Sequence, residues 1–217
     1  MKIVIALGGH ALCPPDPSPI EAQRAAVKQA VVGIAALARK HDVVVTHGNG
    51  PQVGWLAAQA GLGSRAPTPL DMAGAESEGA MGYLLEQELD NALTDRDVVA
   101  LLTQVEVSAD DPAFANPSKP IGPLLDAESE KRLLALGRST GPSRGGRRRL
   151  VPSPEPRSVV EMRTIALLVR MGVVVVCSGG GGIHTHSASF IVEGLTYTKY
   201  QDGASTPAAT LNARQEL

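Results

Sequence analysis

Cysteine is scarce in this chain of 217 residues, which contains only Cys13 and Cys177. Two cysteines so far apart do not make a disulfide framework or a zinc site, and we expect reduced thiols in a cytoplasmic protein. Long apolar runs are also missing. None approaches the ~18 residues that span a membrane, and Gly8 and Gly9 interrupt the N-terminal run before it reaches the length of a signal-peptide core. We therefore expect no membrane partner.

A basic excess is absent too, because 20 Lys and Arg stand against 22 Asp and Glu, for a net charge of -2. A nucleic-acid-binding domain normally carries such an excess, so we expect no nucleic-acid partner. Two phosphate-binding signatures are missing as well, the P-loop G-x-x-x-x-G-K-[ST] and G-x-G-x-x-G after a strand. The spacing of Glu76, Glu78 and Glu161 does not mark a metal site, and we assign no metal ligands.

What the sequence does contain is a set of buried elements, and hydrophobic residues make up 43% of it. Four apolar or β-branched runs without alternation predict parallel strands covered on both faces, at residues 3–7, 43–46, 98–103 and 173–177. Helices are predicted after capping boxes at Ser18 and Ser158, from Pro51 onward, and over residues 71–93. Alternating strands and helices predict an α/β fold.

Two stretches interrupt this alternation. Residues 108–123 are rich in proline and polar side chains, and residues 137–149 are basic and rich in glycine. Together they predict an excursion from the sheet with an exposed, mobile tip. The three arginines 147–149 either steer anionic substrates or are solvated on that tip. Beyond residue 183 no strand–helix alternation is evident.

Glycine-rich segments follow three of the predicted strands, and ligands bind beyond the carboxyl ends of strands in parallel sheets. Glycine lets the backbone approach an anion, and a following helix offers free N–H groups. We therefore expect strand ends at Leu7, Thr46, Thr103 and Cys177 on one common edge. The candidate phosphate- or substrate-binding residues are Gly8, Gly9, His10, Gly48, Asn49, Gly50, Gly179, Gly180 and Gly181. Each of the three segments also has a structural alternative. The first would be an ordinary turn, the second would contain a His47 with a purely structural role, and the third would be a flexible linker.

Lys119 is the candidate catalytic residue. Prolines at 117 and 120 stiffen the backbone around it and would aim its ammonium group. Phosphoryl transfer depends mainly on positioning and charge neutralisation, for which a directed cation is suited. A solvated surface lysine is the alternative.

Seven blocks of this sequence resemble the carbamate kinases of the amino acid kinase superfamily, in that family's order. They are residues 6–12, 45–54 (VTHGNGPQVG), 69–89, 101–107, 111–123 (DPAFANPSKPIGP), 151–161 and 177–183. The resemblance implies an open αβα sandwich with a mainly parallel sheet and a homodimer. It also implies reversible phosphoryl transfer between ATP and carbamate, with ATP or ADP bound with Mg²⁺, usually in the catabolism of arginine or allantoin-type compounds.

The same resemblance assigns roles to residues. Gly8, Gly9 and the Gly48-Asn49-Gly50 segment would hold carbamate and the transferred phosphoryl group, and Lys119 would reach them from a protruding subdomain over residues 108–149. Position 10 is His where the family normally has Asn. The match ends at Ile183, so we expect a family domain over residues 1–183, an unmatched tail over 184–217, and a C-terminal half that is missing or divergent.

Two other functions are weighed against carbamate kinase activity. One is a non-catalytic fragment that keeps the N-terminal fold and a dimer surface, and for this reason we expect weak ADP binding by the 217-residue chain alone. The other is an amino acid kinase that phosphorylates an amino-acid carboxylate. The HGNGPQVG and NPSKPIGP segments disfavour the latter.

Overall fold

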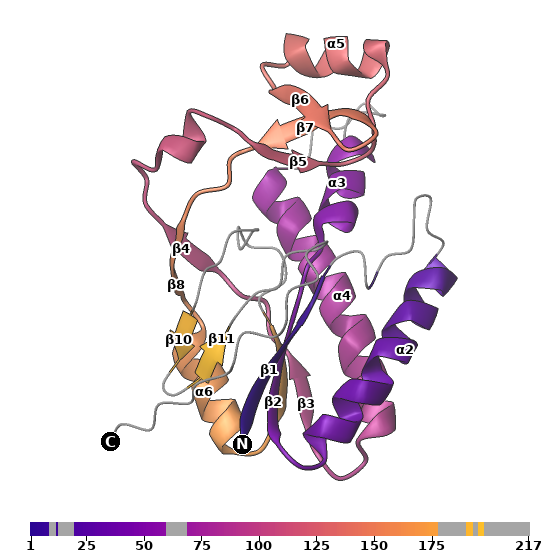
Figure 1. The fold of residues 1–217 in the computed structure, drawn as a ribbon, viewed down its shortest axis with the longest axis vertical. Coiled ribbons are helices and arrows are strands. Elements are labelled where there is room, and N and C mark those ends of the chain that lie inside the picture. The colour runs from indigo at the N-terminus through magenta and orange to yellow at the C-terminus, as the bar shows by residue number, and fades with distance from the viewer. Residues whose placement is uncertain (9–11, 13–19, 60–68, 178–189, 193–194, 198–217) are drawn as a thin grey trace.

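A parallel sheet of four strands forms the centre of the protein. The computed structural model describes residues 1–8, 12, 20–59, 69–177, 190–192 and 195–197. The strand order is β1-β2-β9-β3, and all three pairings are parallel. The strands are β1 (Lys2–Leu7), β2 (Asp42–His47), β9 (Val174–Cys177) and β3 (Val98–Ala100). Helices lie on both faces of the sheet, so the predicted αβα sandwich with a parallel sheet is confirmed (Figure 1).

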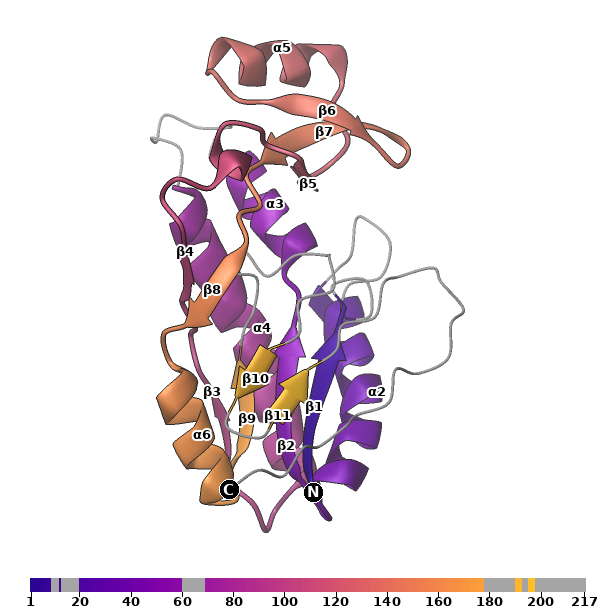
Figure 2. The same ribbon diagram turned by 60° about the vertical axis from the view of Figure 1, so that its left-hand side comes forward.

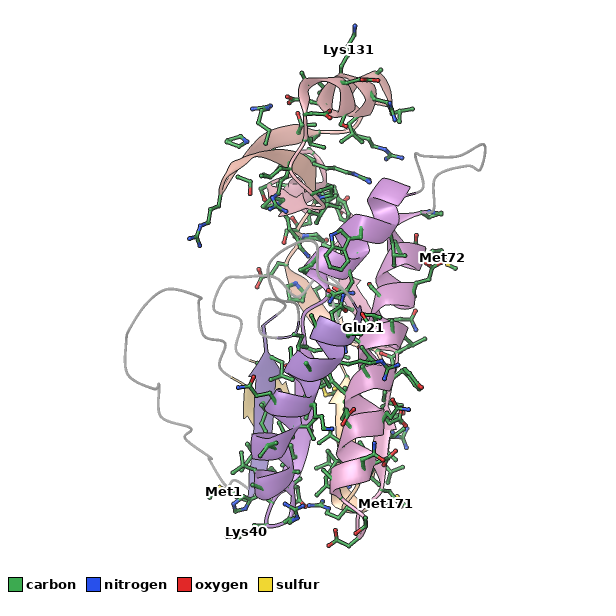
Figure 3. The ribbon with its side chains drawn as sticks, turned by 90° about the vertical axis from the view of Figure 1, so that its right-hand side faces the viewer. Met1, Glu21, Lys40, Met72, Lys131 and Met171 are labelled. Atoms are coloured by element: carbon green, nitrogen blue, oxygen red, sulfur yellow. The ribbon has the colours of Figure 1, made fainter. Side chains whose placement is uncertain are left out.

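Helices α2 (Ile20–Ala38) and α4 (Leu70–Ala92) run side by side over one face of the sheet (Figure 3). Buried residues recur at helical spacing in α2, as at Val27, Val31 and Ile34, and they pack against β2 and α4. On the other face, α6 (Met162–Arg170) buries Ile165 and Val169 against β2 and β9. Since β2 and β9 are covered on both faces, their central residues, 43–45 and 174–176, are continuously apolar.

The hairpin of β10 (Phe190–Val192) and β11 (Leu195–Tyr197) brings β11 against β1 (Figure 2). No helix in the described part of the chain is both long and apolar enough to cross a bilayer.

Two sequence predictions need correction. The strand predicted over residues 98–103 ends at Ala100. Leu101 still donates to Val176 of β9, but Thr103 gives its N–H to the Glu78 carboxylate instead of to a neighbouring strand. Ser158 does not begin a helix: it lies in β8 (Pro156–Val159), and α6 starts only at Met162. The predicted helices from Pro51 and over residues 71–93 are confirmed within a residue, whereas Ser18 lies outside the described residues.

A small separate sheet stands beyond the carboxyl end of the main one (Figures 1 and 2). Its order is β5-β7-β6, and both pairings are antiparallel. The elements are β5 (Lys119–Ile121), α5 (Ala127–Ala135), β6 (Thr140–Ser143) and β7 (Gly146–Val151), which we call the lobe, residues 119–151. The basic segment predicted as an irregular tip is therefore a hairpin, turned at Gly145 and Gly146, which both have positive φ.

Two antiparallel strands, β4 (Val105–Val107) and β8, carry the chain between the sheet and the lobe, and we call them the neck. At its base, Glu78 accepts hydrogen bonds from the N–H and hydroxyl of Thr103. Glu161 accepts from the backbone and side-chain amides of Gln104, at 2.7 and 3.1 Å. Towards the lobe, Asp111 accepts from the N–H of Glu155. Carboxylates therefore hold both ends of the neck.

Helix α3 (Gly50–Gln59) contacts the lobe directly, through Gly54. A Cβ at Gly54 would lie 2.2 Å from the backbone nitrogen of Gly122 and 2.3 Å from its Cα. Gly122 directly follows β5 and has a φ of 75°. The two backbones thus touch with no room for a side chain, and this contact seats the lobe on α3.

Replacing Gly54 by Ala should displace the lobe, since backbone cannot yield as a flexible side chain does. We expect a loss of about 1–3 kcal/mol in unfolding free energy and faster hydrogen exchange over residues 119–151. Gly33→Ala in α2 is the control, because a Cβ there meets nothing within 4 Å, and it should be neutral or stabilise by about 1 kcal/mol. Urea unfolding and exchange mass spectrometry measure both. If the two variants behave alike, the contact between Gly54 and Gly122 does not hold the lobe in place.

Candidate functional site

The strands β1, β2 and β9 end at one edge of the sheet. Leu7 pairs with His47, and Thr46 pairs with Cys177. β3 is parallel to β9 and ends at Ala100, opposite Val176, so all four predicted strands end at this edge. Only the predicted last residue of the fourth strand, Thr103, is wrong.

The first two glycine segments meet at this edge. Gly48 donates its N–H to the carbonyl of Leu7 at 2.9 Å, which places Gly48 beside the residue that precedes Gly8. Gly9, His10, Gly179, Gly180 and Gly181 lie outside the described residues. The structure thus brings together Gly8 and the Gly48-Asn49-Gly50 loop from the predicted set.

That loop leads directly into α3, which begins at Gly50. The first N–H groups of a helix have no partner within it, and they carry the positive end of the helix dipole. A loop of this kind binds anions through backbone donors, and the absence of a side chain at Gly48 and Gly50 leaves the backbone accessible. The geometry suits a phosphate or a small planar anion.

Asn49 orients the loop rather than presenting its amide nitrogen to solvent. Its side chain is buried, and Nδ2 donates to the Ser77 hydroxyl at 2.7 Å and to the Gly74 carbonyl at 3.3 Å. The Ser77 hydroxyl in turn donates to the carbonyl of Ala73. Helix α4 therefore fixes the loop. Sequence reasoning missed Ser77, and a small polar residue on the buried face of an apolar helix was the available signal.

His47 is buried beside the loop, and its Nδ1 has no hydrogen-bond partner among the described residues. It lines a cavity of about 150 Å³ together with residues of α4 such as Glu78 and Tyr83. Burial lowers the pKa of His47 to about 4, against the opposing effect of a backbone hydrogen bond with Gly48. The imidazole is thus neutral near pH 7, so the edge of the sheet gains no positive charge from it.

Lys119 begins β5 in the lobe, opposite Val151, and its side chain is half-buried. The segment before it is anchored, because Ser118 donates to the carbonyl of Val151 and the Asn116 side chain donates to that of Pro112. The strand that carries Lys119 leads to Gly122 and so to the contact with Gly54. Gly54 lies only one helical turn, about 6 Å, from Gly50. The lobe is thus attached one turn from the Gly48-Asn49-Gly50 loop.

Carboxylates at the base of the neck accept backbone hydrogen bonds. In the parts of the chain that the structure describes, no three His, Cys, Asp or Glu side chains gather as a metal site would require. Glu78 and Glu161, the acids singled out in the sequence, instead hold Thr103 and Gln104 at the base of the neck.

The lowered pKa of His47 makes stability depend on pH. The unfolded chain takes up a proton near pH 6.5, but the folded protein does so only near pH 4, so unfolding free energy should fall as pH drops from 6.5 towards 4. The loss is on the order of 2–3 kcal/mol. His47→Gln should remove this part of the dependence, as measured by urea unfolding at pH 7 and pH 5. Parallel losses in the two proteins would contradict the assignment.

Comparison with known proteins supports one family. The amino acid kinase family model matches residues 1–198. A carbamate kinase of Rhizobium meliloti (strain 1021) is 47% identical over 189 residues, which cover 85% of this chain and 58% of that protein. The carbamate kinase of Trichomonas vaginalis is 41% identical over 227 residues, or 98% of this chain and 72% of that protein.

Solved structures agree with this. Carbamate kinase from Giardia lamblia bound to citric acid superposes with a TM-score of 0.75 at 33% identity, covering 91% of this chain and 66% of that one. The same enzyme bound to AMP-PNP gives a TM-score of 0.72, also at 33% identity, covering 91% and 65%. The chain spans only 58% and 61% of the Rhizobium meliloti and Haemophilus influenzae relatives. It belongs to the amino acid kinase family and, within that family, to the carbamate kinases.

Proposed function

We propose that this protein transfers a phosphoryl group reversibly between ATP and carbamate, forming ADP and carbamoyl phosphate. The observation that carries the proposal is the Gly48-Asn49-Gly50 loop at the start of α3, hydrogen-bonded to Leu7, the residue before Gly8, at the sheet edge, in a chain whose relatives are carbamate kinases. The AMP-PNP in the Giardia lamblia structure supports an adenine nucleotide as the second substrate.

In this mechanism the sheet edge supplies neutral donors. Backbone N–H groups at the start of α3, such as those of Gly50 and Gln52, bind anionic oxygens of carbamate and of the transferred phosphoryl group, and Gly8 lets the anion come close. The N–H of Gly48 is already donated to Leu7, and Pro51 has none. Asn49 holds the loop through Ser77. We assign His10 and Gly179–Gly181 to the same phosphate site. Mg²⁺ would enter with the nucleotide phosphates, since it is usually held by them and by one or two carboxylates.

Lys119 supplies positive charge from the lobe. Charge spreads over the oxygens of the phosphoryl group during transfer, so a positioned ammonium lowers the barrier without any covalent step. Its place on a strand seated one helical turn from the loop supports this role.

Lys119→Ala should lower ATP formation from carbamoyl phosphate and ADP by about 10² or more, because the developing charge loses its cation. Lys131→Ala is the control: it removes the same charge from the outer side of α5, where Lys131 points away from the rest of the protein (Figure 3). Both variants are assayed in the 217-residue chain and in this chain extended by the C-terminal part of the Rhizobium meliloti relative. Turnover unchanged by Lys119→Ala would rule out the role of this lysine.

A second candidate function is a non-catalytic protein that keeps this fold and a dimer surface. It is favoured by the share of the relatives that the chain covers, 58% and 61% in two of them. The same assay separates the two functions when calorimetry with ADP is added. Nucleotide binding and turnover confined to the extended chain would support the second function for the 217 residues.

We further propose a homodimer that works in the cytoplasm, in arginine catabolism. The scarcity of cysteine supports that location, and fractionation of cells expressing the tagged protein tests it. Growth of a deletion strain on arginine tests the metabolic assignment. For the dimer, the support is apolar surface: Met72 and Tyr83 on α4 and Leu102 beside it are each more than half exposed.

Tyr83→Arg should dissociate that dimer, since a charge would enter the buried patch. Sedimentation velocity measures the mass of the variant against that of the unmodified chain. Val32→Arg in α2 is the matched control, because Val32 is equally apolar and 70% exposed but lies on another helix. A monomeric unmodified chain, or dissociation by both substitutions alike, would count against a dimer through α4.

A further inference from the structure

Three consecutive arginines on β7 have three different environments. Arg147 donates to Glu130 at 2.6 Å and forms an ion pair with it. Arg148 donates to the carbonyl of Gly122, next to the contact with α3. Arg149 is half-buried, and its Nε is fully buried without a hydrogen-bond partner among the described residues. Two of the three therefore have structural partners, and Arg149 differs from them.

Strand register places Arg149 on the same face of the lobe sheet as Lys119. Arg149 pairs with Ile121, and Lys119 pairs with Val151. Opposite residues in an antiparallel pair share a face, and faces alternate along each strand. Lys119 and Arg149 are therefore diagonal neighbours, with about 7–8 Å between their Cα atoms, which is within reach of long side chains.

The acidic side chains of the lobe are committed elsewhere. Residues 119–151 contain eight Lys and Arg but only three Asp and Glu. Asp126 accepts from Ser129 and caps α5, and Glu128 pairs with Arg132 along the same helix. Glu130 accepts from both Thr140 and Arg147. Among the described residues, then, Arg149 has no carboxylate in an ion pair.

The position of Arg149 costs free energy unless a negative charge joins it. Burial lowers the pKa of Arg149, and the positive charge of Arg138 lowers it further. Like charges on neighbouring positions of a sheet repel each other. An anion between two cations reverses the sign of that interaction, and the planar guanidinium matches two oxygens of a phosphate at once, whereas an ammonium acts as a point charge.

We propose that Arg149 is a second phosphoryl-binding residue of the lobe, which forms a two-cation site with Lys119. It rests on the proposed function, which assigns Lys119 to the transferred phosphoryl group. Arg149 holds two oxygens of that group in a fixed orientation, while Lys119 neutralises charge. The ligand class is a phosphoryl-bearing anion, with carbamoyl phosphate as the substrate of that class.

The test follows the arginine Nε–H resonances of the ¹⁵N-labelled chain during titration with carbamoyl phosphate and, separately, with inorganic phosphate. Arg149→Lys assigns the Arg149 signal, and we expect that signal to shift on binding. Arg149→Met should raise the dissociation constant for carbamoyl phosphate about tenfold or more, because a charge-assisted bidentate contact is lost. Arg149→Lys should raise it about fivefold, because the charge stays while the planar fork is lost.

Arg144→Gln is the matched control. It removes one positive charge from the same hairpin at an exposed position, so it reports long-range charge effects alone, and we expect less than about a twofold change since exposed charges are screened. If Arg149→Met perturbs the lobe signals without ligand, the comparison rests on Arg149→Lys, and wild-type affinity in that variant would overturn the proposal.

The outcomes separate this proposal from the proposed function. If Lys119→Met weakens binding while Arg149→Met behaves like Arg144→Gln, the two-cation site is wrong and the role of Lys119 survives. If neither substitution changes the affinity, or the unmodified chain shows no shift, both are overturned. Weakening by both substitutions, with a shift of the Arg149 signal, supports the two-cation site.

Discussion

The lobe is held where it is by a backbone contact that has no room for a side chain. Gly54 in α3 and Gly122 after β5 approach so closely that a single Cβ would overlap the opposing main chain. Gly54 lies one turn beyond the start of α3, and that start follows the loop that we propose binds anions. A short rigid helix segment therefore sets the separation between the loop and the lobe, and both proposed binding elements depend on it.

Buried and half-buried carboxylates hold the base of the neck through hydrogen bonds. A buried charge is costly unless it is hydrogen-bonded, and Glu78 meets this condition by accepting from the N–H and hydroxyl of Thr103. The bond holds Thr103 beyond the end of β3, where its N–H is not available to a neighbouring strand. Glu161 acts similarly on Gln104 across the neck. Acids that suggested no function in the sequence thus determine where the chain leaves the sheet.

Sequence patterns were sufficient where burial alone decides structure. The strands at 43–46 and 173–177 are covered on both faces, so their apolar runs are unambiguous. Sequence patterns were insufficient where pairing with residues elsewhere in the chain determines the secondary structure. Ser158 lies in a strand because it pairs with Glu106, 52 positions away, and the basic segment forms a hairpin because Arg149 pairs with Ile121 and Thr140. Local spacing carries no information about such pairings.

The proposed site combines neutral hydrogen-bond donors at the sheet edge with charged side chains on the lobe. At the sheet edge the donors are neutral backbone N–H groups, and the neighbouring His47, whose pKa is about 4, adds no positive charge near pH 7. On the lobe they are cations, Lys119 and Arg149, which share one face of a sheet. The edge can therefore bind a substrate through neutral donors alone, whereas positive charge for the transferred phosphoryl group comes only from the lobe. It follows that the seat at Gly54 affects the rate of transfer more than the binding of carbamate.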